Sequence, residues 1–204
     1  SILASYSRFV VDLNRPPDNK NLYPGNVTTG ICPRTLFSGQ AVYQNGREPG
    51  DVDTEERIEL FWKPYHNALT EEIDRIKRNH GYCILFDAHS IRSEVPILFD
   101  GILPDLNLGT NNAKSCCNEL QQLIEQQLKN NNNFSWISNG RFVGGYITRH
   151  YGSPDNAIHA IQMEIGQNAY LPEAEPQVYD KEYAASLKQV LVTLVDQLLE
   201  WQPC

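Results

Sequence analysis

Three polar clusters in this sequence carry the residue types that hydrolysis of an amide bond would need. Residues 87–93, Asp-Ala-His-Ser-Ile-Arg-Ser, place His89 shortly after the apolar run of residues 82–86, which is predicted to be a buried strand. Asn14-Arg15 and Glu164 also lie at or near the ends of apolar, strand-like runs. In an open α/β sheet the catalytic crevice lies beyond the carboxyl ends of the strands, so we expect the three clusters to meet there.

A histidine, a glutamate and an arginine at different strand ends suit metal-assisted amide hydrolysis. Neutral imidazole binds Zn²⁺, which polarises the carbonyl group and acidifies a water molecule. The glutamate then takes the proton from that water, and the arginine holds a substrate carboxylate with two parallel hydrogen bonds. Spacing alone makes this one hypothesis among several.

Each of these residues also has a purely structural interpretation. Asp87 and His89 can simply tie down a loop by hydrogen bonds. Arg15 can pair with an aspartate across a turn. Glu164 can be an ion-paired core residue, although buried glutamates are uncommon enough to favour a role in a site.

Composition limits the class of protein. A chain of 204 residues is long enough for one domain with a substantial core. The hydrophobic content of 41% and the absence of a long apolar run indicate a soluble protein with no membrane partner. Nucleic acid is excluded as a partner by the net charge of −8, which leaves no general basic surface. A small anionic substrate stays possible, because one arginine in a pocket can override the global field.

Cysteine usage and the first residues point to the cytoplasm. The five cysteines are odd in number, and Cys116 and Cys117 are adjacent, so reduced thiols are the simplest interpretation. The sequence contains no Cys-x-x-Cys pair, so a structural zinc site is not expected. The first six residues show neither the basic nor the apolar region of a signal peptide.

Hydrophobic periodicity predicts strands that alternate with helices, which is typical of an α/β three-layer αβα sandwich. Strands are expected over residues 6–13, 82–86, 95–99 and 159–165, and helices over 53–79, 115–129 and 181–201. Asp53 and Glu56 suggest a capping box for the first helix, and Pro64 should kink it. His66 on this helix is expected to be a surface or capping residue. Turns are expected at 15–18, 23–26 and 104–109, and residues 140–152 are expected to form a loop that enters a polar edge strand.

The chain resembles the N-formylglutamate amidohydrolase (N-formylglutamate deformylase) family, which is itself similar to the zinc carboxypeptidases. The residues that carry the resemblance are 7–16, 22–25, 29–33, 61–66, 87–93, 104–109 and 144–152. They are spread over nearly the whole chain. The resemblance implies a three-layer αβα fold with a mixed central sheet, similar to the zinc carboxypeptidases, as a single domain over residues 1–204.

The resemblance also implies the roles of individual residues. His89 matches a zinc ligand, Glu164 matches the general base, and Asn14-Arg15 match the pair that binds the α-carboxylate of the substrate. Further candidates for the substrate pocket are the cations Arg92 and Arg149, either of which could bind the second carboxylate, and the rings Tyr146 and His150. The expected reaction is zinc-dependent hydrolysis of N-formyl-L-glutamate to formate and L-glutamate, a step of histidine degradation.

One departure from the family pattern concerns the metal. Family members begin with a segment that bears a Pro-His-x-Gly motif and an acidic residue, which supply two further zinc ligands. This chain starts downstream of that motif, so we expect an amino-terminally incomplete domain whose zinc is weakly held or absent. Two alternatives therefore stay open: a zinc amidohydrolase that acts on another N-acyl amino acid, and a catalytically silent domain that binds acidic amino acids. The sequence does not predict the oligomeric state.

Overall fold

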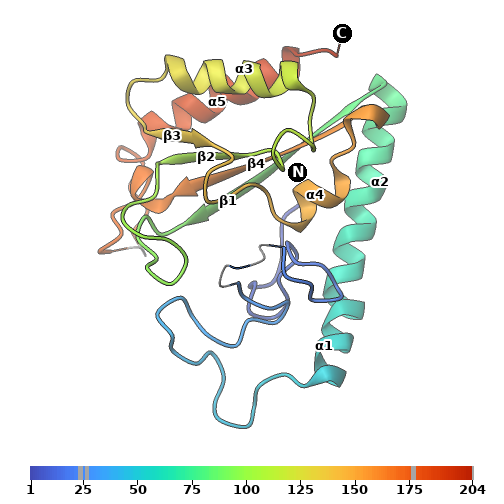
Figure 1. Cartoon of the computed structure of the whole chain (residues 1–204), viewed down its shortest axis with the longest axis vertical. Coiled ribbons are helices and arrows are strands. Elements are labelled where there is room, and N and C mark those ends of the chain that lie inside the picture. Colours follow the sequence, from blue (N-terminus) through green and yellow to red (C-terminus); the bar gives the residue numbers. More distant parts are fainter. Residues whose placement is uncertain (23–24, 26–27, 176–177, 204) are drawn as a thin grey trace.

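A computed structural model describes residues 1–22, 25, 28–175 and 178–203 (Figure 1). The expected turn at 23–26 lies outside these residues, apart from Gly25. In chain order the elements are α1 (Asp51–Arg57), the π-helix η1 (Ile58–Trp62), α2 (Lys63–His80), β1 (Cys83–Ile91), β2 (Leu106–Gly109), α3 (Asn118–Asn130), β3 (Trp136–Ser138), α4 (Tyr146–Tyr151), the 3₁₀-helix η2 (Pro154–Asn156), β4 (Ile158–Gly166), the 3₁₀-helix η3 (Gln167–Ala169) and α5 (Ala185–Glu200).

The four strands form one mixed sheet in the order β1-β4-β2-β3. β1 runs parallel to β4, β4 runs antiparallel to β2, and β2 runs parallel to β3. The expected α/β class with a mixed central sheet is confirmed. Among the described residues, no helix combines the length and the apolarity that a membrane crossing requires.

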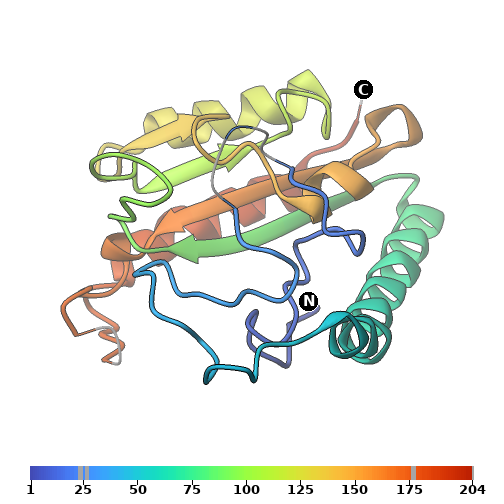
Figure 2. The same cartoon turned by 60° about the horizontal axis from the view of Figure 1, so that its bottom comes forward.

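Helices cover both faces of this sheet (Figures 1 and 2). On one face α3 and α5 pack against the sheet through a core of fully or nearly buried residues that includes Leu106, Leu108, Leu120, Ile124, Leu128, Ile161, Met163 and Leu194. On the other face α2 and α4 pack against β1 through a smaller cluster that includes Leu69, Ile73, Cys83 and Ile147. The arrangement is consistent with the expected three layers.

Strand β1 is longer than expected, and this corrects the placement of His89. The strand was predicted to end at Phe86, with a polar loop over residues 87–93, whereas it continues to Ile91. Its whole length pairs with β4, from Cys83 opposite Ile158 to Ile91 opposite Gly166. Because a neighbouring strand satisfies their backbone groups, the polar residues remain in the strand, and His89 lies inside β1 rather than beyond its end.

In the long first helix, α1, η1 and α2 follow one another without a break, and the π-helical segment η1 lies immediately before α2, which contains Pro64. Pro64 has no N–H to donate to the carbonyl four residues earlier. In the preceding η1 segment the N–H of Lys63 bonds to the carbonyl of Ile58 instead, which accommodates the proline at the start of α2. The helix begins one residue after Gly50, and the Asp53 carboxylate accepts the N–H of Gly50 at 3.1 Å, so Asp53 is not itself the N-cap.

Four other segments also differ from the sequence prediction. Residues 6–13 form turns whose apolar side chains pack in a cluster around Val11, Ile31 and Trp62, away from the sheet. Residues 95–99 form a turn, and residues 146–151 form helix α4 in place of an edge strand. The turn expected at 104–109 is instead the central strand β2, because β4 and β3 pair with it on both sides.

His66 is buried, whereas the sequence predicted a surface or capping residue. Its side chain connects α2 to two other parts of the chain: Nε2 donates to the carbonyl of Leu13 at 2.9 Å, and Nδ1 accepts from the hydroxyl of Tyr151 at 2.8 Å. The ring is 4% exposed and stacks on Trp62. Burial lowers the pKa of His66 to about 4, since the charged imidazole would lose its hydration.

This burial predicts a pH dependence of stability. The folded pKa lies below the ordinary value of 6.5, so the unfolded chain binds more protons between pH 6.5 and pH 4. The stabilisation is therefore complete above about pH 6.5 and should fall by about 3 kcal/mol as the pH drops to 4. Denaturant unfolding at several pH values should show this loss in the wild type and a smaller one in His66→Gln. Equal losses would contradict the assignment.

Candidate active site

A cavity of about 860 Å³ opens on the side of the sheet opposite α3 and α5. Its wall is formed by the irregular N-terminal segment, β1 and β4. This volume is typical of a small-molecule site. The polar side chains that line it include Arg8, Asp12, Asn14, Arg15, Asp87, His89, Arg92, Arg141, Gln162 and Glu164.

The strand register places His89 directly beside Glu164. The two residues are partners in the parallel pairing of β1 and β4, and Asn107 of β2 is the partner of Glu164 on its other side. Paired residues on neighbouring strands point to the same face of a sheet. The structure therefore brings together the two residues that the sequence predicted for the centre of the chemistry.

His89 lies in a strongly acidic setting. Its Nε2 is 2.8 Å from Oδ1 of Asp87, which lies two residues earlier on the same face of β1. Burial disfavours the charged imidazolium, but the hydrogen bond and charge of Asp87, followed by the charges of Glu164 and Asp12, outweigh it and raise the pKa of His89 to about 9.

Glu164 is 8% exposed, which makes it the most deeply buried acidic residue of the cavity wall after Asp12. Burial raises the pKa of Glu164 to about 7, because the loss of hydration outweighs the attraction of His89 and Arg8. Asp87 and Asp12 add to this rise. A carboxyl group with a pKa near neutrality is suited to accept and return a proton.

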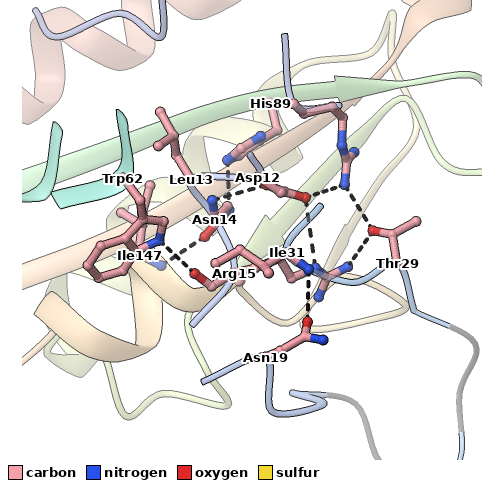
Figure 3. A network of polar contacts seen from close by, with 12 residues as sticks. Asp12, Leu13, Asn14, Arg15, Asn19, Thr29, Ile31, Trp62, His89 and Ile147 are labelled. Atoms are coloured by element: carbon pink, nitrogen blue, oxygen red, sulfur yellow. Dashed lines mark hydrogen bonds and ion pairs between the residues drawn. The ribbon is translucent and has the colours of Figure 1, made fainter. Parts of the chain in front are cut away.

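Asn14 connects the N-terminal segment to the Asp87–His89 pair, and Figure 3 shows its contacts with His89 and Ile147. Its Nδ2 lies 3.2 Å from Oδ2 of Asp87 and 2.9 Å from Nε2 of His89. Its Oδ1 accepts the N–H of Ile147, in the first turn of α4, at 2.8 Å. Because a carbonyl oxygen must accept that N–H, the amide nitrogen of Asn14 is the group that faces Asp87 and His89.

Arg15 lines the cavity, and its guanidinium group contacts the neighbouring side chains of Thr29 and Asp12 (Figure 3). Its side chain donates to the hydroxyl of Thr29 at 3.3 Å and forms an ion pair with Asp12 at 3.8 Å. Its carbonyl accepts the indole N–H of Trp62 at 2.9 Å. The structural interpretation of Arg15 predicted an ion pair with an aspartate, and the pair with Asp12 is present. Arg15 nevertheless also lines the cavity.

The other predicted substrate-binding residues divide into two groups. Arg92 lines the cavity. Tyr146, Arg149 and His150 are not among the described residues that line it: Arg149 donates to the carbonyls of Gly144 and Leu22, and the ring of His150 stacks on Tyr146. Here these three residues hold α4 and its surroundings, and their substrate-binding roles stay predictions.

Several cavity residues were not predicted. Asp87 and Gln162 each lie two positions before a predicted site residue, and the period of two in a strand places them on the same face, although no site role was predicted for them. Arg8 and Arg141 reach the cavity only through the folding of irregular segments, which no sequence period describes.

The described residues do not by themselves fit a catalytic zinc ion. Among them, no three His, Cys, Asp or Glu side chains gather in a way that could hold a metal. Such a zinc ion takes three protein ligands, and His89 is the only imidazole among the described residues that line this cavity. The chemistry of this site is therefore derived from its own side chains.

Comparisons with known proteins agree with this geometry. The model of the N-formylglutamate amidohydrolase family matches residues 1–171. The chain belongs to this family. An N-formylglutamate deformylase of Pseudomonas putida is 46% identical over 200 residues, and one of Pseudomonas aeruginosa is 45% identical over 201 residues. Each alignment covers 98% of the chain, and they span 74% and 75% of the two relatives. The chain is therefore an enzyme, an amidohydrolase.

Solved structures support the fold of the N-formylglutamate amidohydrolase family for this chain. The crystal structure of an N-formylglutamate amidohydrolase from Ralstonia eutropha superimposes with a TM-score of 0.78 at 22% identity and covers 95% of this chain and 74% of that one. A gene product from Agrobacterium tumefaciens gives a TM-score of 0.63 at 16% identity, with 95% and 69% covered.

The contact between Asn14 and α4 predicts the effect of a single added methyl group. A Cβ atom on Gly145 would lie 2.5 Å from the carboxamide of Asn14. Gly145→Ala should therefore lower the free energy of unfolding by about 1–3 kcal/mol. In an Asn14→Ala background the same substitution should cost at least about 1 kcal/mol less. Denaturant unfolding of the four variants measures this coupling, and additive effects would contradict the contact.

Proposed function

We propose that this chain hydrolyses the amide bond of N-formyl-L-glutamate to formate and L-glutamate. The observation that carries the proposal is the pairing of His89 with Glu164 in the wall of a cavity that Arg15 and Arg92 also line. Two relatives that are 46% and 45% identical are named N-formylglutamate deformylase, which supports the same substrate here.

Glu164 is the proposed general base. It would take a proton from a water molecule as the water oxygen attacks the formyl carbon, and would then return the proton to the amide nitrogen as the C–N bond breaks. The products are formate and the free amine of glutamate. Arg8, which lines the cavity and pairs with Asp12 at 2.5 Å, is the proposed positive charge for the negative charge that develops on the formyl oxygen.

The substrate carries two carboxylates, and the cavity offers cations for both. Arg15 and Asn14 are proposed for the α-carboxylate, as the family resemblance implies. For the second carboxylate, Arg92 and Arg141 line the cavity, whereas Arg149 donates to two backbone carbonyls outside it. This geometry supports Arg92 over Arg149 and adds Arg141 as a candidate.

Zinc dependence is a separate proposal. His89 is the proposed ligand from this cavity. Zinc binding would need further ligands that the described residues do not bring together around it. Metal analysis of the purified chain and of His89→Ala tests it. A role in histidine degradation and a cytoplasmic location are likewise proposals that follow from the family resemblance.

Release of formate from N-formyl-L-glutamate is the direct test of the reaction. N-acetyl-L-glutamate and N-formyl-L-glutamine serve as matched controls, because the first changes the acyl group and the second replaces the side-chain carboxylate by a neutral amide of the same size. Faster hydrolysis of either control would favour an amidohydrolase of another N-acyl amino acid. Binding of N-formyl-L-glutamate without formate release would favour a catalytically silent domain.

The role of Glu164 predicts a loss of turnover with binding retained. Glu164→Gln keeps the size of the side chain and one hydrogen-bond acceptor but removes the base. We expect kcat to fall by about 10²-fold or more while KM changes little, because the base acts only as the proton moves. Steady-state formate release measures both constants. A variant with near-normal kcat would show that Glu164 is not the base.

The proposed role of Arg15 predicts that substrate binding weakens even when the positive charge at this position is kept. Arg15→Lys keeps the positive charge but loses the planar fork that binds a carboxylate with two hydrogen bonds. We expect KM to rise by about 10-fold or more. Arg47→Lys, at an exposed position, is the control and should keep the wild-type KM. An unchanged KM in Arg15→Lys would return Arg15 to its structural role beside Asp12.

A further inference from the structure

A buried glutamine lies next to the proposed base in the wall of the cavity. Gln162 is 3% exposed and lies two residues before Glu164, on the same face of β4. Its neighbours Ile161 and Met163 point to the opposite face, into the core with α3 and α5. A polar side chain buried in this way needs partners for both its oxygen and its nitrogen.

Two hydrogen bonds determine the orientation of the Gln162 carboxamide. Oε1 accepts the backbone N–H of Gly145 at 2.8 Å, and Nε2 donates to Oε2 of Glu164 at 3.2 Å. The opposite orientation would place two donors together at Gly145 and two acceptors together at Glu164. Since both sites are buried, that exchange would lose both bonds and leave unpaired polar groups.

The N–H group that orients Gln162 belongs to Gly145, the residue just before α4. The position of Gly145 is itself fixed. Gly145 packs so closely on Asn14 that no side chain fits between them. Asn14 is in turn fixed by the N–H of Ile147. The N–H of Gly145 therefore has a fixed position and orients the carboxamide of Gln162. The Nε2 group of Gln162 is in turn directed at Glu164.

We propose that Gln162 is a positioning residue for Glu164, which it holds by an N–H donor whose direction the backbone of Gly145 sets. The inference rests on the proposed role of Glu164 as the base. One oxygen of the Glu164 carboxylate is engaged by Gln162, which fixes the rotation of the group and directs the second oxygen for proton transfer. Loss of this alignment should slow the reaction without weakening the binding of the substrate, since Gln162 supplies no cation.

A merely structural role for Gln162 makes a different prediction. If the glutamine only joined α4 to the sheet, its loss would affect the whole cavity, and the effect would be the same with or without the Glu164 carboxylate. A positioning role acts only through that carboxylate. The two roles are therefore separated by measuring Gln162 variants in both the wild-type and the Glu164→Gln background.

The experiment measures kcat and KM for formate release from N-formyl-L-glutamate by the chain of 204 residues. Gln162→Met keeps the length of the side chain and removes both hydrogen bonds; we expect kcat to fall by about 10-fold or more, with KM within about threefold of wild type. In Glu164→Gln, the added Gln162→Met should change kcat by less than about twofold. Gln162→Leu removes the same two hydrogen bonds without adding a charge, so it tests the same bond if Gln162→Met does not fold.

Gln121 provides a matched control on the other side of the sheet. Its Oε1 accepts from Thr110 at 2.8 Å and its Nε2 donates to Glu125 at 2.7 Å, the same pattern outside the cavity. Gln121→Met should keep the wild-type kcat.

Three results would overturn the proposal in distinguishable ways. A wild-type kcat in a folded Gln162 variant, or an equal loss in both backgrounds, would overturn the positioning role alone. A wild-type kcat in Glu164→Gln would overturn the proposed base and, with it, the role of Gln162.

Discussion

The parallel pairing of β1 with β4 is the constraint on which the cavity depends. It places His89 beside Glu164 and sends the alternate residues of both strands into the core with α3 and α5. A shift of one residue would turn the acidic and basic groups into that core and the apolar groups toward the cavity. The buried residues of this core therefore hold the polar side chains in register.

The backbone at the start of α4 fixes the orientation of two side chains in the cavity wall. Backbone N–H groups of Gly145 and Ile147 are accepted by the carboxamide oxygens of Gln162 and Asn14. The amide nitrogens of these two residues consequently face Glu164 and the Asp87–His89 pair. The close contact between Gly145 and Asn14, which leaves no room for a Cβ atom, thus helps to set which amide groups face the charged groups of the cavity.

Elements with strong local signals were predicted well, and elements that depend on distant neighbours were not. The strand at 159–165 and the helix at 115–129 were found within a few residues of their predicted bounds. Residues 104–109 contain proline, asparagine and glycine, which favour a turn, yet Leu106–Gly109 form strand β2 because strands on both sides pair with their backbone. Residues 6–13 alternate like a strand, but Val11 packs against Ile31 and Trp62 and the segment forms turns.

The sequence by itself determined the α/β class, the family resemblance and the residue types available for catalysis, because periodicity and local motifs are properties of neighbouring residues. It also singled out His89 and Glu164. Only the tertiary structure decided that the two lie side by side, that Gln162 and Asn14 orient them, and that Arg149 faces backbone carbonyls while Arg141 lines the cavity. These outcomes depend on strand register and on the path of irregular segments, which are set by contacts between residues far apart in the chain.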